Sequence, residues 1–182
     1  KTGKDVKDIK VALGRDPRMS GKRLLDGLME GFGPYGITAY DCGLASTPAM
    51  FMATLFPEFK CDGGIMITAS HLPYNRNGFK FFTEDGGLDK ADIKEILAIA
   101  EDEEAGKDVI GEPTNLDGYT HRLGQRIFPA EPADLMSLYC DYLKKLIVDG
   151  VQDGEKPLEG MKIVVDAGNG SGGFFARKVL AP

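Results

Sequence analysis

The chain alternates short runs typical of β-strands with amphipathic stretches typical of helices. Residues 9–13 alternate apolar and polar side chains, which predicts a strand that runs into the charged loop at residues 14–18. Ser20 is then the expected N-cap of a helix, whose apolar positions recur at helical spacing as far as Phe32. A second strand is predicted over residues 37–42, so strand and helix alternate from the start.

The next two elements continue this alternation. Either Ser46 or Thr47 is the expected N-cap of a helix that extends to about Phe56, with Pro48 at its first helical position. The run at residues 64–68 is almost wholly apolar, which is typical of a strand buried on both faces of a sheet. The order of elements therefore indicates the α/β class.

The middle of the chain contains the strongest helical pattern. Residues 79–83 predict a further strand, and Asp89 is the expected cap of a helix with apolar residues on one face. No period is sustained over residues 107–132, which indicates either an excursion packed on the domain or a functional loop. Residues 135–147 predict a strongly amphipathic helix that stops at Gly150.

The last part of the chain begins a new unit. Residues 151–160 are polar and read as a linker, residues 161–165 predict an apolar strand, and a glycine-rich turn leads to a helix expected near Phe174. A strand, a turn and one short helix cannot bury both faces of a new sheet. We therefore expect the residues after about 158 to be the severed start of a second α/β domain.

Composition narrows the class of protein. The 182 residues are 42% hydrophobic and 27% charged, as in ordinary globular proteins, and the net charge of -6 argues against a general binder of nucleic acid or anionic membranes. No apolar run reaches the roughly 18 residues of a membrane span, and the Lys- and Asp-rich start does not resemble a signal peptide, so we expect a cytoplasmic protein. Three cysteines without C-x-x-C spacing indicate buried free thiols and no zinc site.

The densest group of reactive side chains follows the strand at residues 64–68. A hydroxyl, an imidazole and two cations lie between Thr68 and Lys80, and ligands of open α/β sheets bind beyond the carboxyl ends of strands. Ser70 is therefore the candidate nucleophile, although a turn whose Ser and Asn bond their own backbone has the same composition. A hydrolase dyad of Ser70 and His71 is disfavoured, because adjacent side chains of an extended segment point apart and no G-x-S-x-G motif is present.

Two other loops could contribute to the same chemistry. Arg15 and Arg18 follow another strand, and a guanidinium group matches phosphate oxygens, although a solvated charged turn would have the same pattern. Cationic loops beside a serine favour phosphoryl transfer over hydrolysis. The pattern G-x-G-x-x-G occurs at Gly168, Gly170 and Gly173. It indicates either a dinucleotide-binding site or a glycine turn needed for tight packing of a strand against a helix, and both interpretations stay open.

Several motifs occur together in one order along the chain. They are Gly14-Arg15-Asp16-x-Arg18-x-Ser20-Gly21, then Thr47-Pro48-Ala49, then Thr68-Ala69-Ser70-His71-x-Pro73 with Asn77-Gly78-Phe79-Lys80, and finally Asp166-x-Gly168-Asn169-Gly170. In this order they closely resemble the α-D-phosphohexomutases, a family that includes phosphoglucomutases and phosphomannomutases. The resemblance covers almost the whole chain, and Leu72 departs from it because the family commonly has Asn there.

The pattern and the resemblance together predict the domain organisation. We expect a three-layer α/β/α domain with a mixed sheet over residues 1–158, which carries the phosphoserine loop, and the truncated start of a second similar domain over residues 159–182. The resemblance implies four domains in the whole enzyme. Its aspartate-rich metal loop, sugar-recognition loop and phosphate-binding loop would then lie outside this chain, so the fragment alone is expected to be inactive.

The resemblance also implies an activity, that of an isomerase of the intramolecular phosphotransferase type in carbohydrate metabolism. It would interconvert hexose 1-phosphate and hexose 6-phosphate through a phosphoserine and a hexose 1,6-bisphosphate, and these phosphosugars, not nucleic acid or a membrane, would be its partners. Ser70 matches the phosphorylated catalytic serine, whose phosphoryl oxygen also ligates Mg²⁺. Lys80 and Arg15 match positions that serve proton transfer and the charge near the phosphoserine, and His71 matches a position that supports the same site.

Three further loop residues receive no role in the chemistry. Arg18, Asn77 and Gly78 are assigned to the shape of the loop alone. A dinucleotide-binding oxidoreductase stays open on the glycine turn. A non-catalytic binding module on the same fold stays open because of Leu72 and the missing downstream parts.

Overall fold

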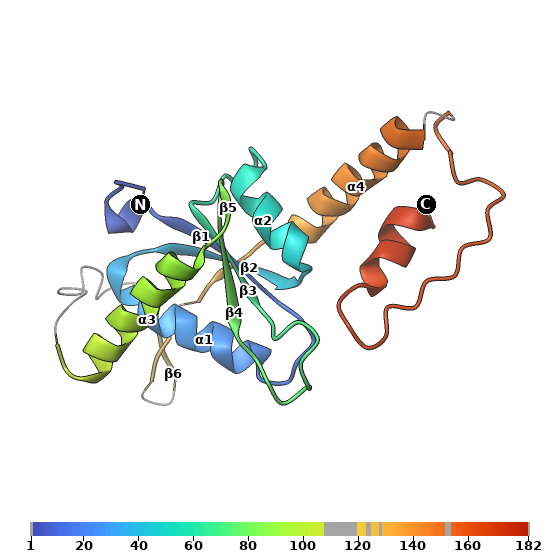
Figure 1. Cartoon of the computed structure of the whole chain (residues 1–182). Coiled ribbons are helices and arrows are strands. Elements are labelled where there is room, and N and C mark those ends of the chain that lie inside the picture. The colour runs from blue at the N-terminus through green and yellow to red at the C-terminus, as the bar shows by residue number, and fades with distance from the viewer. Residues whose placement is uncertain (1, 108–119, 123–124, 128, 152–153, 182) are drawn as a thin grey trace.

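A mixed β-sheet with helices on both faces forms the centre of the protein (Figure 1). The computed structural model describes residues 2–107, 120–122, 125–127, 129–151 and 154–181. Within these ranges, none of the helices combines the length and the apolar character needed to cross a membrane.

The sheet has six strands in the order β5-β4-β3-β1-β2-β8. Their bounds are β1 (Lys10–Arg15), β2 (Thr38–Leu44), β3 (Gly63–Ile67), β4 (Phe79–Thr83), β5 (Gly86–Gly87) and β8 (Glu131–Pro132). β1 pairs in parallel with both β2 and β3, whereas β4 pairs antiparallel with β3 and with β5. The expected mixed sheet is therefore confirmed, and the carboxyl ends of β1 and β3 lie at the same edge because Arg15 is in register with Ile67.

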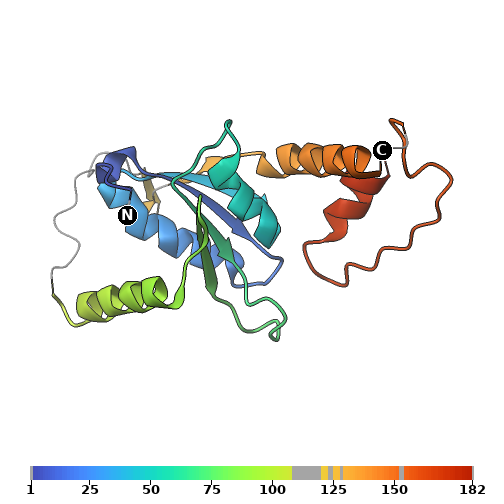
Figure 2. The same ribbon diagram turned by 45° about the horizontal axis from the view of Figure 1, so that its top comes forward.

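Helices cover the two faces of this sheet. Their bounds are α1 (Gly21–Phe32), α2 (Thr47–Leu55), α3 (Lys90–Glu104) and α4 (Leu135–Val151), with short helical turns at η1 (Val6–Asp8) and η2 (Gly33–Tyr35). α1 lies on one face, and α2 with the first turns of α4 lies on the other (Figures 1 and 2). The expected three-layer α/β/α arrangement is confirmed.

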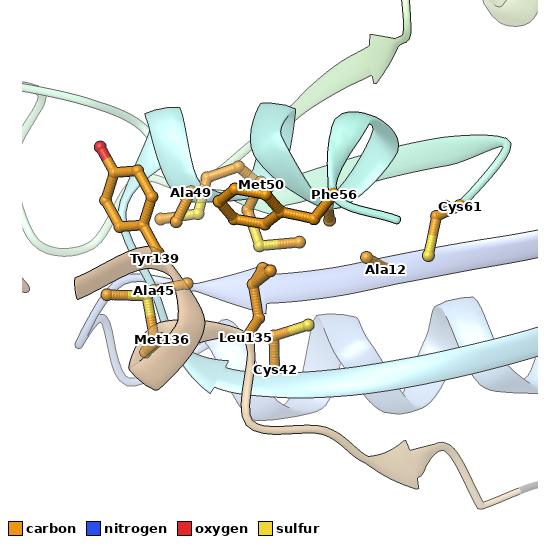
Figure 3. Packing of buried hydrophobic residues seen from close by; sticks show 12 residues of the cluster. Ala12, Cys42, Ala45, Ala49, Met50, Phe56, Cys61, Leu135, Met136 and Tyr139 are labelled. Atoms are coloured by element: carbon orange, nitrogen blue, oxygen red, sulfur yellow. The ribbon is translucent and has the colours of Figure 1, made fainter. Parts of the chain in front are cut away.

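Each face of the sheet has its own core, because alternate residues of each strand point to opposite sides. On β1, Val11 and Leu13 pack with α1, whereas Ala12 packs with α2 and α4. The core on the α2 side combines Met50 of α2 with the first residues of α4, as Figure 3 shows. Its buried members are Ala12, Cys42, Ala45, Ala49, Met50, Ala53, Phe56, Cys61, Met66, Leu135, Met136 and Tyr139.

Two strand glycines let α2 approach the sheet closely. A Cβ added at Gly64 would overlap the backbone carbonyl of Met50, and one added at Gly14 would overlap the Met50 side chain and lie 2.9 Å from the Cβ of Ala45. Both glycines are buried. The small residues of β1 and β3 therefore set how near α2 lies to the sheet, and with it where the N-terminus of α2 is held.

Two expected helix starts differ in detail from the structure. Ser46 is the N-cap of α2 and accepts a hydrogen bond from the Ala49 backbone N–H at 3.4 Å, so Pro48 is the second helical residue and not the first. Ser20 precedes α1 but its side chain does not cap the helix. Its hydroxyl instead accepts a hydrogen bond from Asn77, because a tertiary partner competes successfully for the same oxygen.

The predicted helix after Asp89 forms, but its apolar side is open to solvent. Asp89 caps α3 in a capping box with Asp92, as the sequence pattern suggests. No residue of α3 is buried, and Leu97 is 57% exposed. In Figure 2, α3 lies away from the sheet, beyond α1. The amphipathic pattern therefore predicts this helix correctly. It does not show whether another element packs on the apolar face of the helix.

The stretch without a sustained period contains short strands. β6 (Thr120–Arg122) and β7 (Gln125–Ile127) pair antiparallel, and β8 adds to the edge of the sheet beside β2. Strands of two or three residues are too short to give a period in the sequence. Residues 108–119, within the same stretch, lie outside the described part of the chain.

The C-terminal segment differs most from the expected structure. Residues 161–165 form no strand, and Val164 is 95% exposed. An apolar run becomes a strand only when another strand supplies hydrogen-bond partners, and none of the described strands lies beside it. The expected helix forms as the π-helix η3 (Phe175–Leu180), which lies beside α4, and Phe174 packs on Tyr139 with ring centroids 6.2 Å apart.

Replacement of Gly64 by Ala should be strongly destabilising, because the new methyl group meets the α2 backbone and not a flexible side chain. Overpacking of this kind costs about 1–3 kcal/mol in free energy of unfolding, and we expect Gly64→Ala at the upper end. Gly63→Ala is the matched control on the same strand, since its Cβ would lie 3.6 Å from the nearest atom, the Phe82 carbonyl oxygen. Urea denaturation of both variants measures the difference, and equal stabilities would contradict the proposed close approach.

The cysteines should resist modification in the folded protein. All three are free and buried, which confirms the expectation of buried thiols. Burial raises the pKa of Cys42 to about 12 and that of Cys61 to about 11. Since the thiolate is the reactive form, we expect slow reaction of both residues with a disulfide reagent at pH 8 and fast reaction once guanidinium unfolds the chain. Rapid labelling of Cys42 in the native protein would contradict this expectation.

Candidate functional site

Two loops meet at the edge of the sheet where β1 and β3 end. The Asp16 backbone N–H donates to the Ile67 carbonyl at 3.1 Å, so the first loop begins directly beside the second. The second loop starts at Thr68 and returns at Gly78, and the Thr68 N–H donates to the Gly78 carbonyl at 2.9 Å. This edge is where α/β sheets bind ligands, and the sequence places Ser70 in the second loop.

The Asp16 carboxylate connects the two loops. Its Oδ2 accepts hydrogen bonds from the Thr68 hydroxyl at 2.7 Å and from Arg18 Nε at 2.9 Å. Its Oδ1 accepts from the Arg18 backbone N–H at 3.1 Å. The Asp16 side chain is only 13% exposed. Both oxygens are therefore engaged within the protein, and the role of Asp16 is to hold the loops together.

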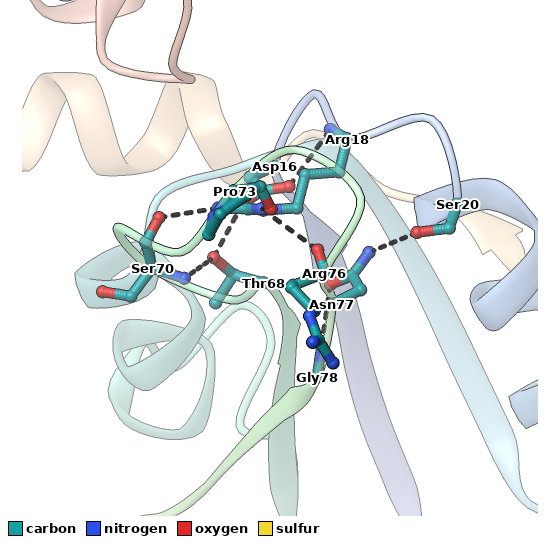
Figure 4. Close-up of polar contacts among 9 residues, drawn as sticks. All are labelled: Asp16, Arg18, Ser20, Thr68, Ser70, Pro73, Arg76, Asn77 and Gly78. Carbon is teal, nitrogen blue, oxygen red and sulfur yellow. Dashed lines mark hydrogen bonds and ion pairs between the residues drawn. The ribbon is translucent and has the colours of Figure 1, made fainter.

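The Arg18 guanidinium group binds the backbone of the Ser70 loop (Figure 4). Nη2 donates to the Ser70 carbonyl at 2.8 Å, and Nη1 donates to the carbonyls of Pro73 and Arg76 at 2.6 and 3.0 Å. Three carbonyl oxygens thus converge on one planar cation. The expectation that Arg18 shapes the loop is confirmed by these contacts.

Ser70 has an unusual backbone conformation. Its φ is +57°, in the left-handed region that L-residues other than Asn and Asp rarely occupy. Its N–H donates to the Thr68 hydroxyl at 2.9 Å, which together with Arg18 fixes both peptide groups of the residue. Among the described residues none forms a hydrogen bond with the Ser70 hydroxyl, and Figure 4 shows this hydroxyl turned away from the other side chains. A strained residue with an available hydroxyl is typical of a functional site.

The far end of the loop is fixed through Asn77. Its Nδ2 donates to the Ser20 hydroxyl at 3.0 Å, and its Oδ1 accepts from the Gly78 N–H at 2.9 Å. The loop is therefore attached to the start of α1 as well as to the β1 loop. This agrees with the expectation that Asn77 and Gly78 determine loop shape.

Ser70 lies on a cleft of about 610 Å³. Asp16, Arg18 and Thr68 line it beside Ser70, residues 46–48 at the start of α2 form another part of the wall, and the glycine turn at residues 169–172 forms a third. The N-terminus of a helix carries a partial positive charge, which favours an anion in the cleft. Sequence reasoning did not connect α2 or the glycine turn with Ser70, since contacts between distant segments leave no local signal.

The other three predicted site residues do not line this cleft. His71 is exposed on the loop, and Lys80 is exposed on β4 opposite Met66, which does line the cleft. Arg15 ends β1 with its Cδ 3.3 Å from the position of a Cβ at Gly21 of α1, and its buried Nε has no hydrogen-bond partner among the described residues. Among the predicted site residues, Ser70 lines the cleft, and the assisting roles of Arg15, His71 and Lys80 stay a prediction.

The described residues do not form a complete metal site. Within them, no group of three or more His, Cys, Asp or Glu side chains gathers. The Asp16 carboxylate is fully engaged by Arg18 and Thr68. A divalent cation at the cleft would thus find the Ser70 oxygen and would need further oxygen ligands from elsewhere.

The comparisons with known proteins agree with one another. Residues 2–107 match the family described as "Phosphoglucomutase/phosphomannomutase, alpha/beta/alpha domain I". The chain is 37% identical over 170 residues to a phosphoglucosamine mutase of Alkaliphilus metalliredigens, an alignment that covers 92% of this chain and 33% of the relative. It is 35% identical over 173 residues to a phosphoglucosamine mutase of Streptococcus pneumoniae, covering 94% of this chain and 34% of the relative. The chain therefore spans about a third of the length of these curated relatives.

A solved structure has the same fold. The crystal structure of a phosphoglucomutase/phosphomannomutase family protein from Burkholderia thailandensis superimposes with a TM-score of 0.57 at 22% sequence identity. The match covers 75% of this chain and 27% of that one. At this identity the similarity concerns the fold.

The Thr68 hydroxyl is expected to stabilise the loop measurably. It donates to Asp16, accepts from the Ser70 N–H, and belongs to a residue that is 6% exposed. Thr68→Val keeps the shape and leaves both partners without this hydroxyl, which should lower the free energy of unfolding by about 1–3 kcal/mol. Thr38→Val on β2 is the control, because Thr38 has no side-chain hydrogen bond to a described residue. Equal denaturant midpoints for the two variants would show that the Thr68 contacts contribute nothing.

Proposed function

The chain belongs to the phosphoglucomutase/phosphomannomutase family, and on this premise we propose that Ser70 is the phosphoryl-carrying nucleophile of a hexose phosphate mutase. The observation that carries the proposal is the geometry of Ser70. Its backbone is held at a φ of +57° and its hydroxyl is available at a cleft. Phosphoryl transfer depends mainly on position and charge, and a serine fixed on both sides meets the first requirement.

The proposed reaction moves one phosphoryl group out and another back. The bond between phosphorus and the Ser70 oxygen breaks as a bond forms to a hydroxyl of the hexose phosphate, and the proton of that hydroxyl passes to a basic group. The resulting hexose 1,6-bisphosphate reorients, and its other phosphoryl group returns to Ser70. Hexose 1-phosphate and hexose 6-phosphate are interconverted, and phosphoserine is restored.

Phosphoglucosamine is the first substrate to test. The relatives at 37% and 35% identity are both phosphoglucosamine mutases. The alignments cover about a third of those proteins, and the sugar-reading part proposed from the resemblance lies outside this chain. Glucose and mannose phosphates therefore belong in the same assay.

We assign supporting roles to Lys80, Arg15 and His71 from the family resemblance. Lys80 lies on β4 opposite Met66, which is a residue of the cleft wall. Lys80 therefore belongs to a strand next to the one that borders the cleft. Arg15 directly precedes Asp16, and His71 directly follows Ser70. Lys80 and Arg15 would serve proton transfer and offset the charge of the phosphoserine, and His71 would support the same site.

Mg²⁺ belongs to the proposed function as well. The Ser70 phosphoryl group would supply one oxygen ligand, and the remaining ligands would come from the longer protein, since no group of three or more His, Cys, Asp or Glu side chains gathers among the described residues. The ion would neutralise part of the charge on the transferring phosphoryl group.

The domain organisation follows the same proposal. Residues 1–158 would form the domain that carries the phosphoserine loop, and residues 159–182 would begin a second one. Turnover would require the longer protein, which we expect in the cytoplasm.

The dinucleotide alternative is not favoured by the local structure. That fingerprint needs a strand before the glycines and a helix after them. In this chain residues 161–165 are not a strand, and a π-helix follows the turn.

Replacement of Ser70 by Ala should abolish the phosphoenzyme and turnover together. The longer protein is incubated with hexose 1,6-bisphosphate and Mg²⁺, and mass spectrometry maps the added phosphoryl group. We expect one phosphoryl group on Ser70 in the wild type and in the control Ser137→Ala on α4, and none in Ser70→Ala. Substantial mutase activity of Ser70→Ala would refute the nucleophile. A folded wild type that acquires no phosphate would favour a non-catalytic binding module.

A further inference from the structure

We propose that Arg18 is a positioning residue for the Ser70 nucleophile, an inference that rests on the proposed function. Sequence reasoning considered Arg18 and Arg15 as possible phosphate ligands. In the structure the Arg18 guanidinium group is directed at the protein backbone, where four of its five N–H donors bind Asp16 and the carbonyls of the Ser70 loop. Arg18 therefore acts on the reaction through Ser70 and not through the substrate.

The ion pair of Asp16 and Arg18 fixes Ser70 from both sides. On the N-terminal side the Ser70 N–H donates to the Thr68 hydroxyl, which donates in turn to Asp16 Oδ2 at 2.7 Å. On the C-terminal side the Ser70 carbonyl accepts from Arg18 Nη2, and Arg18 Nε binds the same Asp16 oxygen at 2.9 Å. Both peptide groups of Ser70 are thus tied to one ion pair, which holds its backbone in the left-handed region.

Among the described side chains, Arg18 alone donates hydrogen bonds to the carbonyls of the Ser70 loop. The carbonyls of Ser70, Pro73 and Arg76 point at one place, where their partial negative charges repel unless a cation lies between them. The side chains of Arg18 and Asp16 are 10% and 13% exposed, so water screens this cluster weakly. Without the guanidinium group the Pro73 carbonyl would keep its hydrogen bond from the Arg76 N–H, but the carbonyls of Ser70 and Arg76 would lose the only hydrogen bond that a described residue gives them. Ser70 could then relax to an ordinary backbone conformation.

A lysine cannot reproduce this arrangement. The planar guanidinium group directs parallel N–H donors at carbonyls on two sides while Nε binds Asp16, whereas an ammonium group has three donors at one point. Arg18→Lys keeps the charge and loses this geometry. A role through charge alone and a role through positioning therefore predict different results for this variant.

The test compares Arg18→Ala and Arg18→Lys with wild type in the longer protein. The rate of Ser70 phosphorylation by hexose 1,6-bisphosphate is followed by mass spectrometry, and kcat and KM are measured separately. We expect both variants to lose about tenfold or more in phosphorylation rate and kcat, with KM within about twofold, because an interaction that orients the nucleophile affects the chemical step. Arg23→Ala, which removes an exposed arginine of α1, should match wild type.

Rescue by methylguanidinium separates positioning from general loss of structure. The ion fits the space left in Arg18→Ala and can donate to the same carbonyls, so it should raise the phosphorylation rate of Arg18→Ala and leave that of wild type unchanged. Circular dichroism checks folding, and if Arg18→Ala does not fold, the rates of Arg18→Lys decide the question.

Each other outcome contradicts the inference in a distinct way. Wild-type rates in Arg18→Ala, or in Arg18→Lys, would show that the guanidinium geometry is not needed. A raised KM with unchanged kcat would make Arg18 a substrate ligand. A folded wild type that acquires no phosphate on Ser70 would refute the proposed function and the positioning role together, whereas normal labelling of both wild type and Arg18→Ala would refute the positioning role alone.

Discussion

The ion pair between Asp16 and Arg18 is the contact on which the geometry of the cleft depends. It lies where β1 ends, and through Thr68 and the Ser70 carbonyl it connects the sheet to the loop that carries Ser70. A single surface ion pair contributes little to stability. This pair differs because both side chains are almost buried and every oxygen of Asp16 is satisfied, so its effect is to select one loop conformation.

The sheet below the loop supplies the rigidity that this selection needs. Gly14 and Gly64 allow α2 to pack against β1 and β3 at a distance that any side chain would increase. That packing holds residues 46–48 in the wall of the cleft, and the parallel register of Arg15 with Ile67 brings the two loops to the same edge. The position of Ser70 is thus a consequence of how small residues are distributed over two strands.

Local pattern was sufficient to predict most elements and to direct attention to the loop that carries Ser70. Strand β3 follows from its apolar run, and the start of α3 follows from the capping residues Asp89 and Asp92. The sequence predicted only that Arg18 shapes its loop. It did not predict that Arg18 binds the Ser70 loop, because the carbonyl partners lie more than 50 residues away in sequence. The absence of a strand at residues 161–165 was not predictable either. A strand forms only beside another strand, and the pattern of one segment does not show whether a second strand lies next to it.

The charged groups that line the cleft can position Ser70 but offer little positive charge to balance a phosphoryl group. A phosphoryl group on Ser70 would carry close to two negative charges. Among the described side chains that line the cleft, Asp16 and Arg18 neutralise each other, which leaves the partial charge at the N-terminus of α2 as the remaining attraction. That is too little to balance a phosphate dianion, and Lys80 and Arg15, the cations expected to help, do not line the cleft. If Ser70 carries a phosphoryl group as proposed, the described residues would fix its position, and the charge that stabilises its transfer would come from residues or ions outside the cleft wall.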